Sequence, residues 1–433
     1  MSLRADVTSL REEAQLTGGD RTLTQSDSAG SHLMILLAGA VPGEASGNAV
    51  SSEVLRAALS EVGVVTQLTH RTSFTPSFQE RSAIASRLIE LGTQPFAIHG
   101  EALLAGAIHG RRLRAWRCAW AVNSRYAGGL LSARIPYAIW EATITQDELE
   151  STSVAEARSS GRGSGIGVAV HSLSLPMGRR IEGLLYRRAK VLCTMSAHTR
   201  RRITAVHGIP PEKVILLQHP PSQSYLAALD HVRNRLVPGG APDESVLRLL
   251  FVGRVDDPRK NVVELLRAVI MVRSTGTCVR LTVVGPFSEA WRIRFGELLR
   301  TSDARLLGRV SVERLAEEYL SHDVFVLPSR QEGFGVVVAE ALHAGLPVIS
   351  THCGGPEEII RASEGGVLVD HGAPAIAAAI QMLAADRSCR LGLAGKARSY
   401  AERELSFPLF TARVRSLTED LLRSGKRLSL RRT

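Results

Sequence analysis

Short apolar segments alternate with amphipathic segments along most of the chain, and this alternation occurs in two separate series. In the first series, the expected strands are Leu33–Ala38, Val64–Leu68, Pro95–Ile98, Ile135–Trp140 and Val191–Thr194. In the second series, they are Leu247–Val252, Val279–Val284, Arg305–Leu307, Asp323–Leu327, Pro347–Ser350 and Gly366–Val369. Strands that alternate with helices form a parallel sheet with helices on both faces. The sequence therefore predicts an α/β protein with two doubly wound, Rossmann-like domains.

Length and local composition divide the chain further. A chain of 433 residues is too long for one ordinary domain and suits two. Residues 1–32 are polar and lack periodicity, which predicts a disordered leader. A composition shift over residues 223–246 predicts a linker between an N-terminal domain at 33–222 and a C-terminal domain at 247–405. A helix and a basic tail are expected at 406–433. Paired domains of this kind bind ligands in the cleft at the carboxyl ends of their strands.

The composition is that of a globular protein, with 44% hydrophobic and 22% charged residues. The cysteines are scattered, without a CxxC pair or a histidine at ligand spacing. We therefore expect a cytoplasmic protein with neither a disulfide framework nor a zinc site. No run of 18 apolar residues occurs, so no membrane-spanning segment is expected. The Ser/Gly/Arg-rich residues 151–167 predict a flexible surface loop.

The chain is strongly basic, with a formal net charge of +11. Basic residues gather in Arg111–Arg117, Arg179–Lys190, Arg200–Arg202 and Lys426–Arg432. Aromatic residues make up only 5% and do not interleave with these clusters, which disfavours nucleic acid as a partner. Two interpretations stay open: solvated charge dispersed over a soluble protein, or a face that binds peripherally to the anionic inner face of the cell membrane.

The strongest local signal is PSRQEGFGVVVAEAL, from Pro328 to Leu342. An apolar strand ends just before it and a helix is expected to begin near Gly335. The loop between them lies beside the unpaired N–H groups of a helix N-terminus, which bind anions. Glu332 is on this loop and Glu340 is about two turns into the helix. Both carboxylates are therefore expected to face one cleft.

A second strand end carries the sequence VGRVDDPRKN, which ends at Asn261. Asn261 is the expected N-cap of the next helix, with Glu264 completing a capping box. Arg254 and Lys260 then lie on a loop that faces the cleft. A guanidinium fork and an ammonium group are suited to binding a diphosphate.

The segment from Glu332 to Glu340 resembles the Glu–seven residues–Glu signature of the family 4 glycosyltransferases, which are retaining enzymes with the GT-B fold. Other segments resemble the same family in the same order: Gly253, Arg254 and Lys260, then Val283–Gly285, Leu306–Val310, His322–Ser329, Gly345–Ser350 and Cys353–Ile360. The resemblance is almost continuous over residues 245–372. It implies two Rossmann-like domains that face each other across a cleft, with a nucleotide diphosphate sugar bound by the C-terminal domain.

The N-terminal half resembles the family less closely. Ser196–Ile203 and His207–Leu217 resemble the last strand and helix of the family's N-terminal domain. The loop Gly43–Val50 resembles a glycine-rich loop that contacts the donor phosphate. This chain keeps Gly47 there but has Asn48 where many members have a second glycine.

A second departure follows the expected strand at 135–140. Many members carry a histidine near the transferred sugar, where this chain has Trp140-Glu141-Ala142. Glu141 is therefore a candidate for the sugar or acceptor side of the cleft. His99 follows the apolar segment at 95–98 and is a second candidate, with an ordinary core or rim histidine as the alternative.

The resemblance implies a role for each matching residue. Arg254 and Lys260 would neutralise the departing diphosphate, and Glu340 would accept hydrogen bonds from the ribose hydroxyls. Glu332 and the backbone of Gly333–Gly335 would hold the sugar near its anomeric carbon. The donor-binding candidates are Gly253, Gly333, Phe334, Gly335, Glu340, Val310 and Gly47. No Asp-x-Asp motif occurs, so neither a metal nor another cofactor is expected.

The expected function is a metal-independent, retaining glycosyl transfer from a nucleotide diphosphate sugar to the hydroxyl of a small-molecule, glycan or lipid-linked acceptor. A positive centre at the sugar carbon is stabilised by a nearby carboxylate. Charge on the leaving group is stabilised by the two cations. The alternatives are a GT-B sugar-nucleotide epimerase or phosphorylase, or a binder of nucleotide sugars without turnover.

Overall fold

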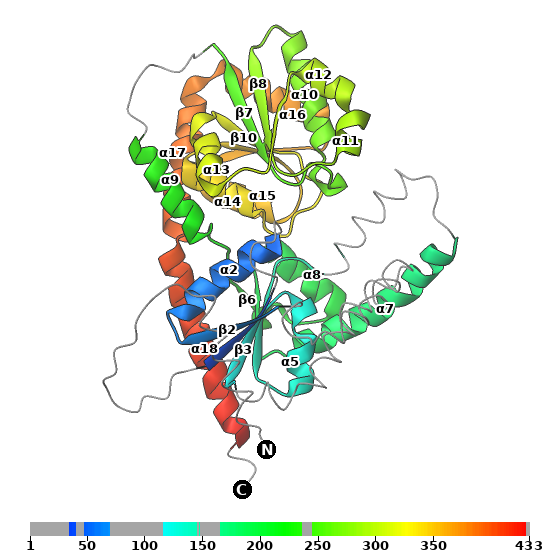
Figure 1. Ribbon diagram of the computed structural model, residues 1–433, viewed down its shortest axis with the longest axis vertical. Helices are drawn as coiled ribbons and strands as arrows, with labels where there is room; N and C mark the ends of the chain where they lie inside the picture. Colours follow the sequence, from blue (N-terminus) through cyan, green and yellow to red (C-terminus); the bar gives the residue numbers. More distant parts are fainter. Residues whose placement is uncertain are drawn as a thin grey trace, which may run out of the picture.

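The computed structural model describes residues 34–39, 47–69, 116–144, 147, 165–235 and 245–429. Within these ranges the chain forms two six-stranded sheets, ordered β2-β1-β3-β4-β5-β6 and β12-β11-β10-β7-β8-β9. All pairs of neighbouring strands are parallel. The sheets belong to two domains that lie one above the other in Figure 1, with helices packed around each. The predicted α/β class with two doubly wound sheets is confirmed.

The sheet of the N-terminal domain contains one strand that the sequence analysis does not predict, β3, and a further strand, β6, that lies within the segment His207–Leu217 discussed above. Its strands are β1 Met34–Gly39, β2 Val64–Thr69, β3 Cys118–Val122, β4 Tyr137–Glu141, β5 Val191–Thr194 and β6 Val214–Leu216. Every residue of β3 and β4 is buried. A strand buried on both faces has no polar alternation, so the sequence CAWAV of β3 gives little strand signal.

The sheet of the C-terminal domain agrees with the predicted strands to within one residue at each end. Its strands are β7 Leu247–Val252, β8 Val279–Val284, β9 Arg305–Gly308, β10 Val324–Leu327, β11 Val348–Thr351 and β12 Gly366–Val369. The central strand β7 pairs with β8 and β10, and these three strands are almost wholly buried. Their carboxyl ends form the edge that faces the N-terminal domain.

The helices of the described residues fall into three groups. Those of the N-terminal domain are α2 Gly47–Ser60, α5 Gly128–Ala133, α7 Gly165–Arg188 and α8 Ala197–His207. Those of the C-terminal domain are α10 Val262–Ser274, α11 Glu289–Arg294, α12 Gly296–Ser302, α13 Val312–Ser321, α14 Val336–Ala344, α15 Gly355–Ser363, α16 Ala373–Ala385 and α17 Arg387–Glu404. The connecting helices are α9 Gln223–Arg235 and α18 Phe407–Ser429.

Helix α9 occupies much of the segment 223–246 that the sequence analysis assigns to a linker. Its side chains Tyr225, Ala228, Leu229 and Val232 are buried. They recur at helical spacing, and the helix packs against α13 and α14 of the C-terminal domain. Residues 223–235 are therefore a packed helix rather than an extended connection.

Helix α18 returns to the N-terminal domain and lies beside β3 and α2 (Figure 1). The indole N–H of Trp120 in β3 donates to Thr418 Oγ1 in α18 at 3.1 Å, in the protein interior. The helix extends to Ser429 and so includes part of the expected basic tail. The two domains are thus joined through α9 and again through α18.

Several predictions lie outside the described residues: the leader at 1–32, the strand at 95–98, His99 and most of the loop at 151–167. Residues 165–167 are described, and they form the first turn of α7 rather than loop. Within the described ranges, no helix has both the length and the apolar composition needed to cross a bilayer.

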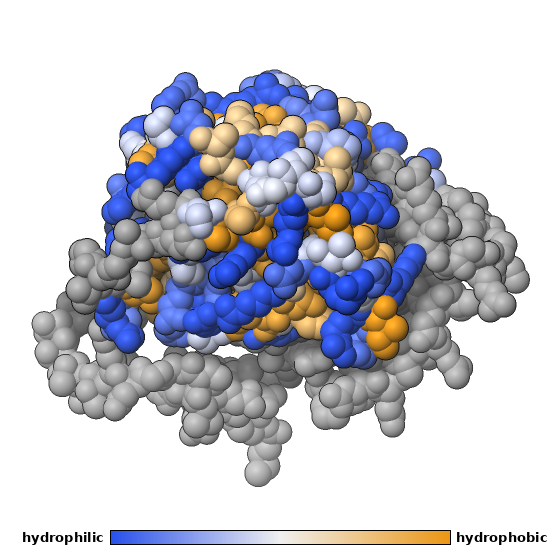
Figure 2. All heavy atoms as spheres, turned by 90° about the horizontal axis from the view of Figure 1, so that it is seen from above, coloured by the Kyte–Doolittle hydropathy of each residue, from blue (hydrophilic) through white to orange (hydrophobic). Residues whose placement is uncertain are grey.

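Figure 2 views the molecule from the end formed by the C-terminal domain. Hydrophilic residues predominate on this face, and apolar residues form small groups between them. Arginines of this domain are paired with neighbouring carboxylates, as in Arg292–Glu289 at 2.6 Å and Arg300–Glu297 at 2.5 Å. Such exposed pairs contribute little to stability, but they disperse the positive charge.

Candidate active site

The loop after β7 holds two arginines around one carboxylate. Asp257 caps the short 3-10 helix Pro258–Lys260 by accepting from the backbone N–H of Arg259 at 3.0 Å. Its carboxylate also binds Arg259 at 2.8 Å and Arg254 at 2.6 Å. Burial acts to raise the pKa of Asp257, but the hydrogen bonds and charges of these arginines outweigh it and hold the pKa below its ordinary value. Arg254 stays about half exposed, with its guanidinium available to a ligand.

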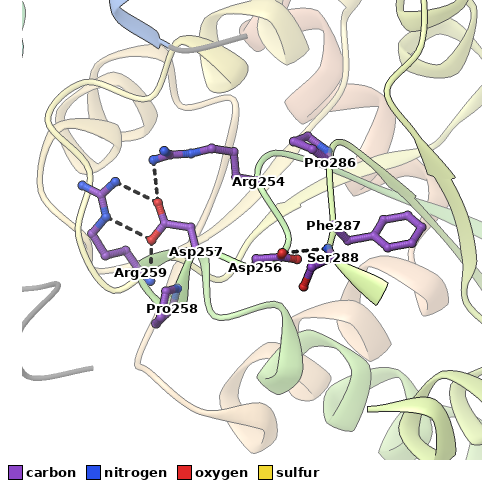
Figure 3. A pocket seen from close by; sticks show the side chains of 8 residues that line it. All are labelled: Arg254, Asp256, Asp257, Pro258, Arg259, Pro286, Phe287 and Ser288. Atoms are coloured by element: carbon purple, nitrogen blue, oxygen red, sulfur yellow. Dashed lines mark hydrogen bonds and ion pairs between the residues drawn. The ribbon is translucent and has the colours of Figure 1, made fainter. Parts of the chain in front are cut away.

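A cavity of about 510 Å³ lies between this loop and the loop after β8. It is lined by Arg254, Asp256, Asp257, Pro258, Arg259, Pro286, Phe287 and Ser288 (Figure 3). Asp256 joins the two loops by accepting from the backbone N–H of Ser288 at 2.7 Å. The volume is within the range of small-molecule sites. Lys260 is not among the lining residues, so the cavity borders Arg254 but not Lys260.

Lys260 forms an ion pair with Glu332 at the carboxyl edge of the same sheet. The ammonium group lies 2.5 Å from Glu332 Oε1, which also accepts from the hydroxyl of Ser329 at 2.7 Å. Both charged side chains are more than four-fifths buried. The loop that carries Glu332 is fixed by a backbone hydrogen bond from Glu332 to Cys353, at 2.7 Å. The structure thus brings together a cation and a carboxylate that are 72 residues apart in sequence.

Glu340 lies inside α14, and its carboxylate is held by an aromatic side chain. The hydroxyl of Tyr319 donates to Glu340 Oε2 at 2.9 Å, and that of Tyr225 donates to the Glu340 carbonyl at 3.0 Å. Burial raises the pKa of Glu340 to about 7, while the hydrogen bond from Tyr319 opposes the shift. The described contacts of Glu340 are with these two tyrosines and not with Lys260 or Glu332.

The two domains touch at the glycine loop next to Glu332. A Cβ atom on Gly333 would lie 2.2 Å from the carbonyl oxygen of Ala142, in the loop after β4. The Ser196 hydroxyl, at the N-terminus of α8, donates to the Gly333 carbonyl at 2.6 Å. Gly335 caps α14 with φ 84°, in the left-handed region that favours glycine. Only glycine allows the backbones of the two domains to approach this closely at Gly333.

Sequence comparison finds that this C-terminal domain is similar to a known family. Residues 247–386 match the model of the family Glycosyl transferases group 1. A D-inositol 3-phosphate glycosyltransferase of Thermomonospora curvata is 33% identical over 210 residues, which are 44% of this chain and 47% of that protein. A GDP-mannose-dependent alpha-mannosyltransferase of Mycolicibacterium smegmatis is 34% identical over 169 residues, 39% of this chain and 41% of that protein. The chain thus matches less than half the length of these relatives.

Solved glycosyltransferases share the fold of the two domains. A sucrose-phosphate synthase of Thermosynechococcus elongatus has a TM-score of 0.65 at 18% identity and covers 90% of this chain and 100% of its own. Anabaena HepE, solved in complex with UDP-glucose, has a TM-score of 0.62 at 15% identity, with 90% and 100% covered. The two facing domains are therefore a GT-B fold, as the resemblance implies.

Within this GT-B fold, one predicted residue lies away from the cleft. Glu141 is 1% exposed and accepts from the backbone N–H of Ser124 at 2.7 Å and from the Tyr186 hydroxyl at 2.9 Å. The prediction that Glu141 replaces the family's histidine is wrong. Successive residues of a strand point to opposite faces of the sheet, so the side chains of Trp140 and Glu141 are buried on opposite faces of the sheet. Trp140 stacks on His219, near the boundary between the domains.

The predicted capping box at the start of α10 is also wrong. Asn261 has φ 53°, and its side chain donates to the Pro328 carbonyl at 3.2 Å instead of capping the helix. Glu264 accepts from the backbone N–H of Ala373 at 2.9 Å and pairs with Arg267. Asn261 therefore ties the two predicted loops together, which sequence spacing alone does not indicate.

The other predicted residues lie where the motifs place them. Gly253 follows β7 and donates its N–H to the Val284 carbonyl at 2.9 Å. Val310 precedes α13 and is half-buried, and Gly47 begins α2. Among the described residues, no group of three or more His, Cys, Asp or Glu side chains is arranged to hold a metal ion.

Sequence reasoning misses several polar residues at the domain boundary. Asn123 follows the unpredicted strand β3 and bonds Asn48 of α2 at 2.6 Å. Tyr319, which donates a hydrogen bond to Glu340, lies in the amphipathic helix α13, and the sequence pattern of this helix indicates only a core residue. The positive φ of Asn123 has no sequence signature, because asparagine is common in ordinary turns.

Proposed function

We propose that this protein transfers a glycosyl group from a nucleotide diphosphate sugar to the hydroxyl of an acceptor, with retention of the anomeric configuration. The observation that carries the proposal is the ion pair of Lys260 with Glu332, before the N-terminus of α14, with Arg254 on the same loop as Lys260. This arrangement offers positive charge to a departing diphosphate and a carboxylate to the sugar carbon. Preorganised charges of this kind stabilise the charge that develops in a transition state.

In the proposed reaction, the bond between the anomeric carbon and the diphosphate oxygen breaks and its electron pair leaves with the diphosphate. The acceptor oxygen bonds to the same carbon, and its proton goes to an oxygen of the departing diphosphate. Lys260 and Arg254 would stabilise the negative charge on the leaving group. Glu332 would stabilise the positive charge that develops on the sugar. Glu340 would accept hydrogen bonds from the ribose hydroxyls.

The names of similar proteins support the choice of donor class. A relative is named for GDP-mannose, and a structural neighbour was solved with UDP-glucose. We infer that the donor of this chain is a uridine or guanosine diphosphate sugar. The test is to add UDP-, GDP-, ADP- and dTDP-sugars to the purified protein and measure melting temperature, because a ligand of the native state raises it. An increase with ADP- or dTDP-sugars alone would contradict this assignment.

Product analysis tests the reaction itself. With the donor identified, the transferred sugar should appear on an acceptor with its anomeric configuration unchanged, as measured by NMR. Release of a free epimerised sugar would show that the protein is an epimerase rather than a transferase. Turnover that depends on inorganic phosphate would show that it is a phosphorylase. Donor binding without any turnover would identify a non-catalytic binder.

Metal independence is a further part of the proposal. Arg254 and Lys260 supply the positive charge that a divalent cation would otherwise provide to a diphosphate. We expect full transferase activity in the presence of excess EDTA, measured as nucleoside diphosphate release. Complete loss that added Mg²⁺ or Mn²⁺ restores would contradict this expectation.

A further inference from the structure

Asn123 has a backbone conformation that residues other than glycine rarely adopt. It follows the last residue of β3 with φ 71° and ψ 153°, and it is 2% exposed. This region of conformational space is essentially confined to glycine, and such strain persists only where surrounding contacts maintain it. The contacts of Asn123 therefore indicate what the strained conformation achieves.

The side chain of Asn123 joins two elements of the N-terminal domain. Its Oδ1 accepts from the backbone N–H of Ala142, after β4, at 3.0 Å. Its Nδ2 donates to Oδ1 of Asn48, in the first turn of α2, at 2.6 Å. A backbone N–H can only donate, so the orientation of the Asn123 amide is fixed. Asn48 must then turn its oxygen toward Asn123 and its N–H₂ group away from the pair.

Both ends of this amide pair reach the glycine loop of the C-terminal domain. The Ala142 carbonyl lies against Gly333, the residue after Glu332. Ser51, one turn after Asn48, bonds His219 at 3.0 Å, and the ring of His219 stacks on Phe334 with centroids 6.2 Å apart. In Figure 1, α2 lies on the side of its domain that faces the C-terminal domain. The first turn of α2 is thus held at the cleft, close to the proposed sugar site.

We propose that Asn48 is a donor-recognition residue and that Asn123 is its positioning residue. Asn123 turns the half-buried Asn48 amide so that its N–H₂ group donates to an oxygen of the nucleotide sugar, either a phosphate oxygen or a sugar hydroxyl. This inference rests on the proposed transferase function. The pair stands at the two places where the sequence departs from its family: the glycine position at Asn48 and the histidine region at Ala142. The side-chain amide of Asn48 would thus supply a polar contact to the donor at this part of the cleft.

Three variants test the contact. Asn48→Ala removes the donor group. Asn123→Asp keeps an acceptor for Ala142 but cannot donate to Asn48, so the Asn48 amide turns its N–H₂ toward Asp and its oxygen toward the ligand. Asn48→Asp still accepts from Asn123 but presents a carboxylate to the ligand. Asn234→Asp, on an exposed face of α9, is the control for the change in charge.

The measurement is the dissociation constant by calorimetry for UDP-glucose, GDP-mannose, UDP and GDP. We expect each cleft variant to weaken binding about tenfold, and Asn48→Asp more. The melting temperature without ligand should fall in Asn48→Ala, which removes the acceptor of the buried Asn123 amide, and fall less in Asn48→Asp, which keeps an acceptor. Weaker binding of both the sugar nucleotide and the nucleoside diphosphate identifies a phosphate oxygen. Weaker binding of the sugar nucleotide alone identifies a sugar hydroxyl as the group that Asn48 contacts.

The double variant Asn48→Ala with Asn123→Asp tests the positioning role. If Asn123 acts through Asn48, the double variant binds as weakly as Asn48→Ala and no weaker. Additive losses would overturn the positioning role. Parent-like affinity in Asn48→Ala would overturn the contact and leave the transferase proposal standing. A parent protein that binds none of the four probes would overturn both.

Discussion

Lys260 and Glu332 neutralise each other in the partly buried site, so replacing either side chain leaves the other charge with fewer partners. In Lys260→Ala, we expect donor binding to weaken by about 1.5–3 kcal/mol, because a charge-assisted contact to phosphate is lost. The dissociation constant of the donor should rise roughly 10- to 100-fold in a calorimetric titration. Lys396→Ala breaks an exposed ion pair of 2.7 Å between α17 and Glu364 at the end of α15, and is the matched control. Unchanged donor affinity in Lys260→Ala would place the diphosphate elsewhere.

Glu332→Gln keeps the shape of the side chain and removes its charge. We expect turnover to fall more than donor affinity, because the carboxylate matters most when positive charge develops on the sugar. Glu340→Gln should do the opposite and weaken mainly donor binding, since Tyr319 already holds one of its oxygens. Steady-state kinetics and donor titration of both variants distinguish these roles. A change in KM alone for Glu332→Gln would make Glu332 a binding residue.

At the scale of elements, β4, α7 and α8 enclose a buried polar network that the proposed reaction does not use. Burial, together with the Glu182 carboxylate, raises the pKa of Glu141 to about 8. Hydrogen bonds from Ser124 and Tyr186 and the charge of Arg125 oppose this shift. Glu182 in turn lies 3.0 Å from the ring of His207 in α8. The folded protein therefore keeps a proton on Glu141 that the unfolded chain releases near its ordinary pKa of 4.5.

The sign of the pH dependence follows from that difference. Between about pH 4.5 and 8 the folded state binds more protons at Glu141, so the free energy of unfolding falls as the pH rises. The slope is at most about 1.4 kcal/mol per pH unit. In Glu141→Gln we expect urea unfolding at pH 5.5, 6.5 and 7.5 to show a smaller decrease than in the parent. Glu53→Gln, on the exposed face of α2, should keep the parent slope. If the free energy of unfolding of Glu141→Gln fell with pH as steeply as that of the parent, the pH dependence would not come from Glu141.

Elements with strong local signals were predictable from sequence, and those defined by distant contacts were not. The strands of the C-terminal domain are apolar runs between turn signals, and their ends place Arg254, Lys260 and Glu332 at one sheet edge. Strand β3 lacks such signals, and Asn123 was missed with it. Asn261 has the sequence of an N-cap, but its contact with Pro328 overrides the local preference. Helix α9 shows apolar spacing, which the polar, Pro- and Gly-rich residues after it obscured.

At the scale of the whole molecule, the candidate site depends on the approach of the two domains. The Glu358 carboxylate, near the N-terminus of α15, accepts from the backbone N–H of Ala197 at 2.6 Å and from Arg201 at 3.1 Å. Glu358 thus compensates the unpaired N–H groups at the start of α8. Together with the contact of Gly333 against Ala142, this interaction keeps the Glu332 loop against the N-terminal domain. In the proposed reaction, the acceptor would therefore enter beside this contact rather than through it.

The surface charge of the N-terminal domain leads to a prediction about membranes. Several arginines of its basic clusters already have protein partners: Arg179 with Val206, Arg187 with His207, Arg201 with Glu358 and Arg202 with Asp147. The two ion pairs, Arg201–Glu358 and Arg202–Asp147, reduce the charge that the clusters offer to a lipid surface. Arg180, Arg188 and Lys190, on and just after α7, are exposed.

Each exposed basic residue contributes about 1 kcal/mol next to an anionic leaflet. The three exposed residues named above, from the part of the chain that the structure describes, give a dissociation constant of several millimolar, which screening weakens further at physiological salt. We therefore expect the protein to sediment with phosphatidylglycerol vesicles at low ionic strength and to stay in the supernatant at about 0.15 M salt. With neutral phosphatidylcholine vesicles, it should stay in the supernatant at both salt concentrations. Sedimentation with anionic vesicles that resists salt would instead require an apolar contact with the bilayer, and would support an acceptor presented at the membrane.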